Sequence, residues 1–267
     1  MKNFCVVILA AGQGTRMKSA LQKVLHELFG KSMISHIVEV AQELCPDKVL
    51  VVVGHQKEGV KRELAHNNVE FVEQAVPLGT GDAVRRAEKI LKGYEGDVLI
   101  LCGDTPLLRT ETLHNLLKLH RKEAPAATIL TARLKDPTGY GRIKRNGTGE
   151  VDAIVEEADA APEERRINEI NAGVYIFSAP KLFASLSAIK TDNVKGEYYL
   201  TDAIHILRTS GDRIVAWTTQ EPEEILGINN PKELEIARKV LAKRRGRSAT
   251  LLMRRVRSIR PAGASRR

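Results

Sequence analysis

The feature that most constrains the fold is an apolar run near the N-terminus that ends in a glycine-rich turn. Residues 4 to 9 form this run, with no alternation of apolar and polar side chains. Such a run is typical of a strand that is buried on both faces, as in a parallel sheet. The turn that follows, from Ala10 to Gly14, has small residues that let a ligand approach the backbone, and its N–H groups could bind an anion.

Two cations follow this turn, Arg16 and Lys23, and both side chains can pair with phosphate oxygens. The glycine spacing matches neither the dinucleotide-binding fingerprint nor the P-loop. Turns between a strand and a helix often contain two glycines without binding a ligand. The glycines alone therefore leave a structural turn and a phosphate-binding loop both open.

Strand and helix patterns alternate through the first half of the chain. Apolar runs predict strands at 48–53, 69–72, 97–102 and 126–134, and the segments between them predict helices at 32–44, 56–66, 82–91 and 110–122. This alternation predicts an α/β fold with a doubly wound, mostly parallel sheet of the Rossmann-like kind.

The pattern changes after residue 134. Strands are predicted at 140–143, 151–155, 170–177 and 213–218, and helices at 181–188, at 199–209 and from Pro231 onward. The first two of these strands flank a Gly-rich turn at 146–149 that is typical of a hairpin. We expect this half to form a mixed-sheet extension that covers one side of a cleft.

The net charge of +9 belongs to the C-terminal end of the chain. Residues 243–267 hold Lys243, nine arginines and no acidic residue, which leaves 32 basic against 33 acidic residues in 1–242. A segment with so many like charges repels itself, and we expect a folded domain at 1–242 and a basic, disordered tail at 243–267. Arginine-rich tails bind phosphate backbones without specificity, and the near-neutral body argues against a specific nucleic-acid partner.

The three cysteines, Cys5, Cys45 and Cys102, are far apart and lack metal-ligand spacing. They indicate buried thiols in a reducing compartment. No apolar segment approaches the roughly 20 residues that span a bilayer, and the N-terminus lacks a signal-peptide pattern. The sequence predicts a cytoplasmic protein with no membrane partner, and a monomer or weak oligomer.

Several longer strings, taken together, are far more specific than any single glycine motif. They are LAAGQGTRM, KVLH, PLGTGDA, CGDTPLL, PTGYGRI, IVEEADA, NEINAGVYIF, GEYYLTD and GINN. In content and order these strings resemble the sugar-phosphate nucleotidyltransferases, and in particular the uridylyltransferase domain of GlmU-type bifunctional proteins. The resemblance covers about nine tenths of the chain, residues 1 to about 242, as a nucleotidyltransferase domain.

The resemblance implies roles for individual residues. Arg16 and Lys23 would be the catalytic cations on the phosphates, and Asp104 and Asn229 would hold Mg²⁺. The substrate-binding residues would be Leu9, Ala10, Ala11, Gly12 and Gly103 for the nucleotide, Gln74, Gly79 and Thr80 for uracil, and Gly141, Glu156, Asn171, Tyr199 and Thr201 for the sugar and its phosphate.

Each role has a structural alternative when the residue is taken alone. Asp104 could cap the turn that follows it, and Gln74, Glu156 and Asn171 could be solvated polar residues at loop ends. Tyr199 could belong to the core. An Asn before Pro231, such as Asn229, could serve only as a helix cap.

Three features depart from the family pattern. Cys102 stands where the family usually has tyrosine, which removes any ring contact. Gln22 precedes Lys23 where proline is usual, and we expect a looser lysine loop. Nothing after Arg244 resembles the left-handed β-helix of the family, so we expect no acetyltransferase domain in this chain.

The resemblance implies magnesium-dependent transfer of a uridylyl group from UTP to N-acetylglucosamine 1-phosphate. The product, UDP-N-acetylglucosamine, is a precursor of cell-wall peptidoglycan. Two alternatives stay open: a nucleotidyltransferase for another sugar 1-phosphate, and a catalytically silent homologue that binds a nucleotide sugar. The intact Arg16, Lys23, Asp104 and Asn229 argue against the silent homologue.

Overall fold

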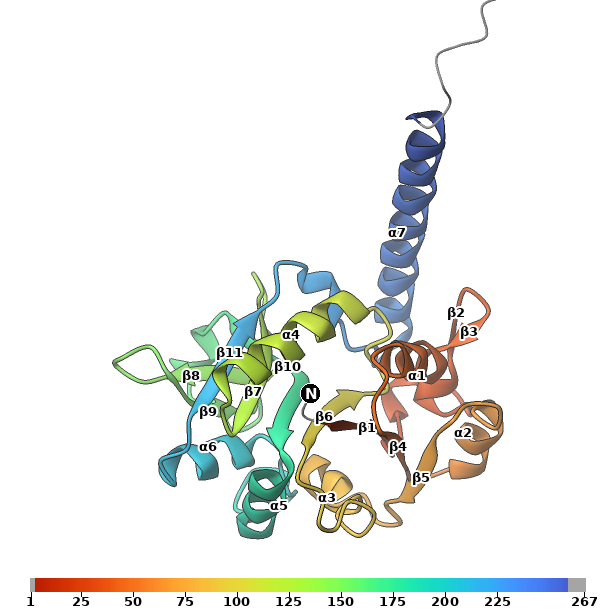
Figure 1. The fold of residues 1–267 in the computed structure, drawn as a ribbon. Coiled ribbons are helices and arrows are strands. Elements are labelled where there is room, and N and C mark those ends of the chain that lie inside the picture. The colour runs from red at the N-terminus through yellow and green to blue at the C-terminus, as the bar shows by residue number, and fades with distance from the viewer. Residues whose placement is uncertain (1–2, 259–267) are drawn as a thin grey trace, which may run out of the picture.

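The computed structural model describes residues 3–258, which form a mixed sheet covered by helices on both faces (Figure 1). The strand order β11-β7-β10-β6-β1-β4-β5 is extended by the β8–β9 hairpin, which pairs with β10. The strands are β1 (Phe4–Ala10), β4 (Lys48–Val53), β5 (Glu70–Glu73), β6 (Asp97–Cys102), β7 (Ala127–Arg133), β8 (Arg142–Arg145), β9 (Val151–Val155), β10 (Glu169–Ser178) and β11 (Ile214–Thr218).

The helices divide between the two faces of the sheet according to the alternating side chains of β1. Phe4, Val6 and Ile8 pack with α1 (Met33–Glu43), α2 (Lys57–Glu63) and α4 (Thr110–Glu123). Cys5 and Val7 pack with α3 (Thr80–Arg85), α5 (Ala179–Ala188) and α6 (Asp202–Thr209) on the other face. This arrangement confirms the predicted doubly wound α/β fold.

Strand β10 runs opposite to both of its neighbours and separates β7, which was predicted with the first half of the chain, from the other strands of that half. β1 is parallel to both β4 and β6, whereas β10 runs antiparallel to β6 and β7. The antiparallel β10 makes the sheet mixed, as predicted, and β11 is parallel to β7. The carboxyl ends of β1 and β6 therefore meet at one edge, and ligands bind at such edges in open α/β sheets.

Several boundaries differ from those predicted. Helix α3 ends at Arg85 instead of residue 91, and α6 begins at Asp202 instead of 199, which leaves Tyr199 and Thr201 in the loop before it. A small hairpin, β2 (Glu27–Leu28) and β3 (Lys31–Ser32), was not predicted. It turns through Phe29 and Gly30, both with positive φ, and is too short to leave a periodic pattern.

The last helix, α7 (Pro231–Ser258), continues well past the predicted domain limit at residue 242 and projects from the body (Figure 1). Leucine, alanine and arginine are strong helix formers, which explains a helical backbone where the charge pattern indicated disorder. The Arg244 guanidinium donates to the Leu107 carbonyl at 2.5 Å, and the Arg245 guanidinium lies 4.5 Å from the centre of the Phe29 ring. Residues 259–267 of the predicted tail lie outside the described residues, and its mobility stays a prediction.

Among the residues that the structure describes, no helix is both long and apolar enough to cross a membrane.

Ser32 begins α1 as predicted, because its Oγ accepts a hydrogen bond from the Ser35 backbone N–H at 3.2 Å. Replacing Ser32 by alanine should lower the free energy of unfolding by about 1 kcal/mol, since the N–H loses its partner. Urea denaturation measures this loss. The control is Ser187→Ala on the exposed side of α5, which should change stability by no more than about 0.5 kcal/mol. Equal losses in both variants would contradict the capping role.

Candidate functional site

The turn after β1 packs directly against Lys23. Gly14 has a φ of +66°, and a Cβ added there would lie only 2.4 Å from the Lys23 Cβ. Gln22, beside the lysine, is buried, and its amide nitrogen donates to the Ala10 carbonyl at 3.0 Å. We expected Gln22 to loosen this loop, but its amide ties the lysine segment to the end of β1.

The four predicted phosphate and metal residues meet in one cluster. The Lys23 ammonium lies 2.5 Å from Asp104 Oδ2 and 2.9 Å from Asn229 Oδ1. The Arg16 guanidinium also donates to Asn229 Oδ1, at 2.9 Å. An ammonium has three N–H donors, so Asp104 and Asn229 leave one that can reach a ligand oxygen.

Backbone hydrogen bonds hold the three segments of this cluster together. The Gly103 N–H donates to the Leu9 carbonyl at 2.9 Å, which fixes the end of β6 against β1. The Ile228 N–H donates to the Asp104 carbonyl at 2.9 Å, which places the segment before α7 beside β6. Residues that are far apart in sequence therefore lie in one site because the sheet edge brings them there.

The cluster also suits a divalent cation. A carboxylate oxygen and an amide oxygen converge on one positively charged centre, now the Lys23 ammonium, and oxygen donors of these kinds are what Mg²⁺ prefers. No group of three or more His, Cys, Asp or Glu side chains is arranged for a metal within residues 3–258. Phosphate oxygens and water would have to complete the ligand set, as is usual for Mg²⁺.

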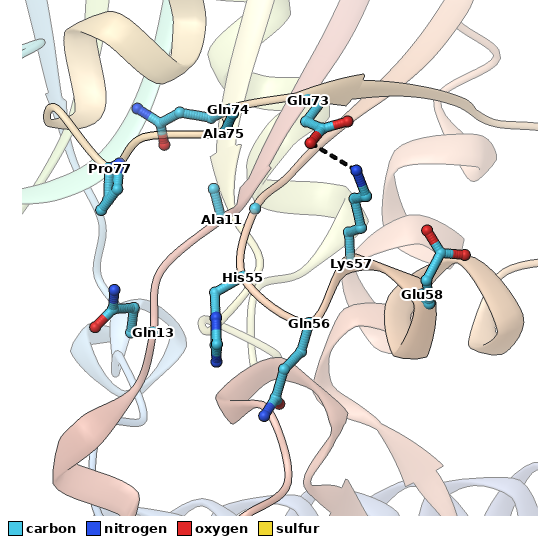
Figure 2. Close-up of a pocket in the computed structure, with 11 residues that line it drawn as sticks. Ala11, Gln13, His55, Gln56, Lys57, Glu58, Glu73, Gln74, Ala75 and Pro77 are labelled. Atoms are coloured by element: carbon cyan, nitrogen blue, oxygen red, sulfur yellow. Dashed lines mark hydrogen bonds and ion pairs between the residues drawn. The ribbon is translucent and has the colours of Figure 1, made fainter.

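A pocket of about 440 Å³ opens beside this cluster, within the size range of small-molecule sites. The predicted residues that line it are Leu9, Ala10, Ala11, Gly12, Lys23, Gln74, Gly79, Thr80 and Asp104. Cys102, Gln13 and Glu197 line it as well. A smaller pocket of about 390 Å³ shares Ala11, Gln13, Gln74 and Pro77 and continues over His55 and Gln56 (Figure 2).

The far wall of the larger pocket is a loop that pairs with the segment before α6. The Gly81 N–H donates to the Tyr198 carbonyl, and the Tyr198 N–H donates to the Leu78 carbonyl, both at 2.8 Å. Gly79 has a φ of +113°, and a Cβ there would lie 2.5 Å from the Tyr198 carbonyl oxygen. Thr80 Oγ1 accepts from the Leu200 N–H at 3.0 Å. The predicted uracil residues therefore sit on a fixed wall.

The predicted sugar-binding residues form a second group along β9, β10 and the loop before α6. The Thr201 hydroxyl donates to Glu156 Oε1 at 3.0 Å, and the Asn171 amide donates to the Tyr175 hydroxyl at 2.6 Å. The Asn171 N–H donates to the Gly141 carbonyl at 2.9 Å. Tyr199 is buried, and the Lys195 ammonium lies 5.8 Å from its ring centre.

Cys102 lies between the two groups, since it lines the larger pocket and its thiol donates to the Gly173 carbonyl in β10 at 3.4 Å. Burial, followed by the charge of Asp104, raises the pKa of Cys102 to about 12. The thiol is therefore protonated at neutral pH and is not a nucleophile. All three cysteines are free, and Cys5 is buried as expected, whereas Cys45 is exposed.

Sequence reasoning missed Asp82, which is fully buried next to Gln74. The sequence analysis placed Asp82 at the start of the helix predicted at 82–91 and gave it no functional role. In the structure α3 begins at Thr80, and its first turn faces the interior. The Gly-Asp string within PLGTGDA was the available signal, but only the fold shows where the carboxylate points.

The pH dependence of stability tests whether Glu156, one of the predicted sugar-binding residues, is buried. Burial raises the pKa of Glu156, despite the hydrogen bond from Thr201. Its contribution to stability is therefore full below the unfolded pKa, about 4.3, and is lost as the pH rises through the higher folded value. Glu156→Gln removes this loss, so its melting temperature relative to wild type should increase between pH 4 and pH 7.

The matched control is the neighbouring carboxylate of Glu157. Burial raises its pKa, but the hydrogen bonds from Arg142 and the Gly139 N–H, together with the charges of Arg142 and Arg165, outweigh burial and lower the pKa. Glu157→Gln should therefore lose melting temperature relative to wild type over the same pH interval. A pH-independent difference for Glu156→Gln would contradict the account of Glu156.

Comparison with known proteins gives one family and many close relatives. Residues 6–205 match the model of the MobA-like NTP transferase domain. The chain is 47% identical over 244 residues to the bifunctional protein GlmU of Halalkalibacterium halodurans, covering 91% of this chain and 53% of that protein. It is 49% identical over 229 residues to GlmU of Bacillus licheniformis, covering 86% and 50%. For GlmU of Enterococcus faecalis the identity is 45% over 244 residues, covering 91% and 53%.

The chain thus spans about half the length of these curated relatives. The matches confirm the resemblance that the longer sequence strings indicated.

Proposed function

Because the chain belongs to the family of MobA-like NTP transferase domains, we propose that it transfers a uridylyl group from UTP to N-acetylglucosamine 1-phosphate. The products are UDP-N-acetylglucosamine and pyrophosphate. The observation that carries the proposal is the meeting of Arg16, Lys23, Asp104 and Asn229 in one cluster, of which Lys23 and Asp104 line a pocket of about 440 Å³. Relatives that are 45 to 49% identical carry the name bifunctional protein GlmU, which supports the choice of reaction.

The chemistry needs positioning and charge neutralisation more than proton transfer. An oxygen of the sugar 1-phosphate attacks the α-phosphorus of UTP in line, the bond to the bridging oxygen breaks, and pyrophosphate leaves. The nucleophile is already an anion, so no general base is required. Lys23 and Arg16 offset the repulsion between the two polyanions, and the backbone of Leu9 to Gly12 orients the nucleotide.

Asp104 and Asn229 would hold a magnesium ion, which supplies charge stabilisation to the transferred phosphoryl group when it is bound. The two side chains already share one cation, which supports this assignment.

The uracil would contact Gln74, Gly79 and Thr80 on the pocket wall. Glu156 and Asn171 would bind the sugar hydroxyls and the N-acetyl group, with Tyr199, Thr201 and Gly141 shaping that subsite. The hydrogen bond between Thr201 and Glu156 supports this grouping, because it fixes the direction of the carboxylate.

UTP and a sugar 1-phosphate are therefore the proposed partners, and the reducing cytoplasm is the proposed compartment. The three free thiols support this compartment. A different sugar 1-phosphate is the second candidate. The residues proposed to bind the sugar, Glu156 and Asn171 among them, would discriminate between the two sugars.

The direct test is pyrophosphate release from UTP, CTP and dTTP with N-acetylglucosamine 1-phosphate, glucose 1-phosphate and galactose 1-phosphate. We expect UTP with N-acetylglucosamine 1-phosphate to give the highest kcat/KM. The reaction should stop in excess EDTA and return with added Mg²⁺. Equal turnover in EDTA would remove the metal role, and no turnover of any pair would favour the silent homologue.

The phosphate cluster makes a separate prediction. Arg16→Ala and Lys23→Ala should each lower kcat by roughly 100-fold or more, the scale for the loss of one preorganised charge-stabilising group. The control is Arg133→Ala on β7, whose exposed side chain lies 4.0 Å from Glu169 and does not line the pocket, and it should keep wild-type kinetics. Unchanged kinetics in a folded Arg16→Ala protein would exclude Arg16 from catalysis.

A further inference from the structure

Asp82 is a buried carboxylate that lies beside the pocket and has no role in the proposed reaction. Its Oδ2 accepts from the Gln74 amide nitrogen at 2.9 Å. Its Oδ1 accepts from the guanidinium groups of Arg85, at 3.1 Å, and Arg86, at 2.9 Å. Arg86 also makes two longer bonds to Oδ2, at 3.2 and 3.3 Å. The side chain is fully buried, whereas both arginines are partly exposed at the surface.

These contacts fix which end of the Gln74 amide faces the pocket. The Gln74 nitrogen also donates to the Gly79 carbonyl at 3.0 Å, so both of its hydrogens are bound by groups that only accept. A flipped amide would place the Gln74 oxygen against two acceptor oxygens. In Figure 2 the Gln74 nitrogen points away from Ala11 and Gln13, and its oxygen lies on their side; all three residues line both pockets.

The two arginines keep Asp82 ionised. Burial raises the pKa of Asp82, but the hydrogen bonds from Gln74, Arg85 and Arg86 outweigh burial and leave the pKa below its usual value. A protonated Asp82 could donate to the Gln74 oxygen and permit the flipped amide. The ionised carboxylate can only accept hydrogen bonds. By keeping Asp82 ionised, the two arginines therefore fix the orientation of the uncharged Gln74 amide.

We infer that Asp82 is a positioning residue that selects the nucleotide base by presenting the Gln74 oxygen, as an acceptor, to the pocket. This inference rests on the proposed function. A base with an N–H group at that position, such as uracil or thymine at N3, satisfies the acceptor. Cytosine has an unprotonated N3 and would place one acceptor against another, a mismatch that buried polar sites reject strongly.

The decisive variant is Asp82→Asn, which keeps the size of the side chain. Arg85 and Arg86 only donate, and their two shorter bonds, both to Oδ1, favour keeping the one remaining oxygen there, which turns the new amide nitrogen toward Gln74. Two nitrogens then face each other, so the Gln74 amide loses the bond that fixes it and can present its nitrogen as well as its oxygen to the pocket. The ratio of the Kd for CTP to the Kd for UTP, measured by titration calorimetry, should fall by about 10-fold or more.

Two controls separate this effect from a general loss of structure. Glu224→Gln changes another buried carboxylate, which accepts from Thr112 at 2.6 Å on the opposite side of the sheet from α3, and should leave the ratio unchanged. Gln74→Met removes the amide, and Asp82→Asn added to it should cause no further change in the ratio. A wild-type ratio in Asp82→Asn, or an equal fall in the Gln74→Met background, would overturn the inference.

A measurement without nucleotide keeps the inference testable on its own. In protein labelled with ¹⁵N-glutamine, the Gln74 amide resonances are those absent from Gln74→Met. Their protons should exchange with water far more slowly in wild type than those of the exposed Gln220, and the protection should fall in Asp82→Asn. If wild-type Gln74 exchanges as fast as Gln220, Asp82 does not hold the amide. If Gln74 is protected but wild type binds neither UTP nor CTP, the proposed function fails and the positioning role stands.

Discussion

The site depends on one ammonium group, that of Lys23, which joins three parts of the chain. It contacts Asp104 at the end of β6 and Asn229 before α7, while Gly14 packs on its stem. Without the close approach at Gly14, the lysine segment could not lie against the β1 turn. Without the backbone bond from Ile228 to Asp104, Asn229 would not reach it. The sheet edge thus sets the position, and the ammonium supplies the positive charge that lets the oxygens of Asp104 and Asn229 lie close together.

Much of this arrangement was predictable, because its main elements are locally encoded. The apolar runs placed β1 and β6 to within one residue, and parallel pairing then required Gly12 and Asp104 to lie at one edge. Asn229 was predicted only through the resemblance, since nothing local ties residue 229 to residue 23. Asp82 was not predicted at all. Its burial is set by the Gly79–Gly81 turn against Tyr198, a contact between segments over 100 residues apart.

The two departures from the family pattern show how the fold absorbs changes beside the site. Gln22 lacks the rigidity of proline, but its amide binds the Ala10 carbonyl and restrains the same loop through a hydrogen bond. Cys102 lacks a tyrosine ring, and its thiol bonds to Gly173 across to β10. From the sequence alone, Gln22 is expected to lose the rigidity of proline and Cys102 to lose a ring contact. The structure shows each side chain making a hydrogen bond that restrains the segment around it.

The charged groups at the two ends of the pocket have opposite requirements. At the phosphate end, Arg16 and Lys23 must remain available to a polyanion, so their partners are few and the cluster is partly open to solvent. At the base end, specificity requires a fixed pattern of donors and acceptors, so the charge is buried and saturated. Asp82 holds there only because two arginines and one amide satisfy both of its oxygens. A charged group that binds a ligand must keep some of its hydrogen-bonding positions free, whereas one that orients a neighbour needs all of them occupied. Asp104 is of the first kind and Asp82 of the second.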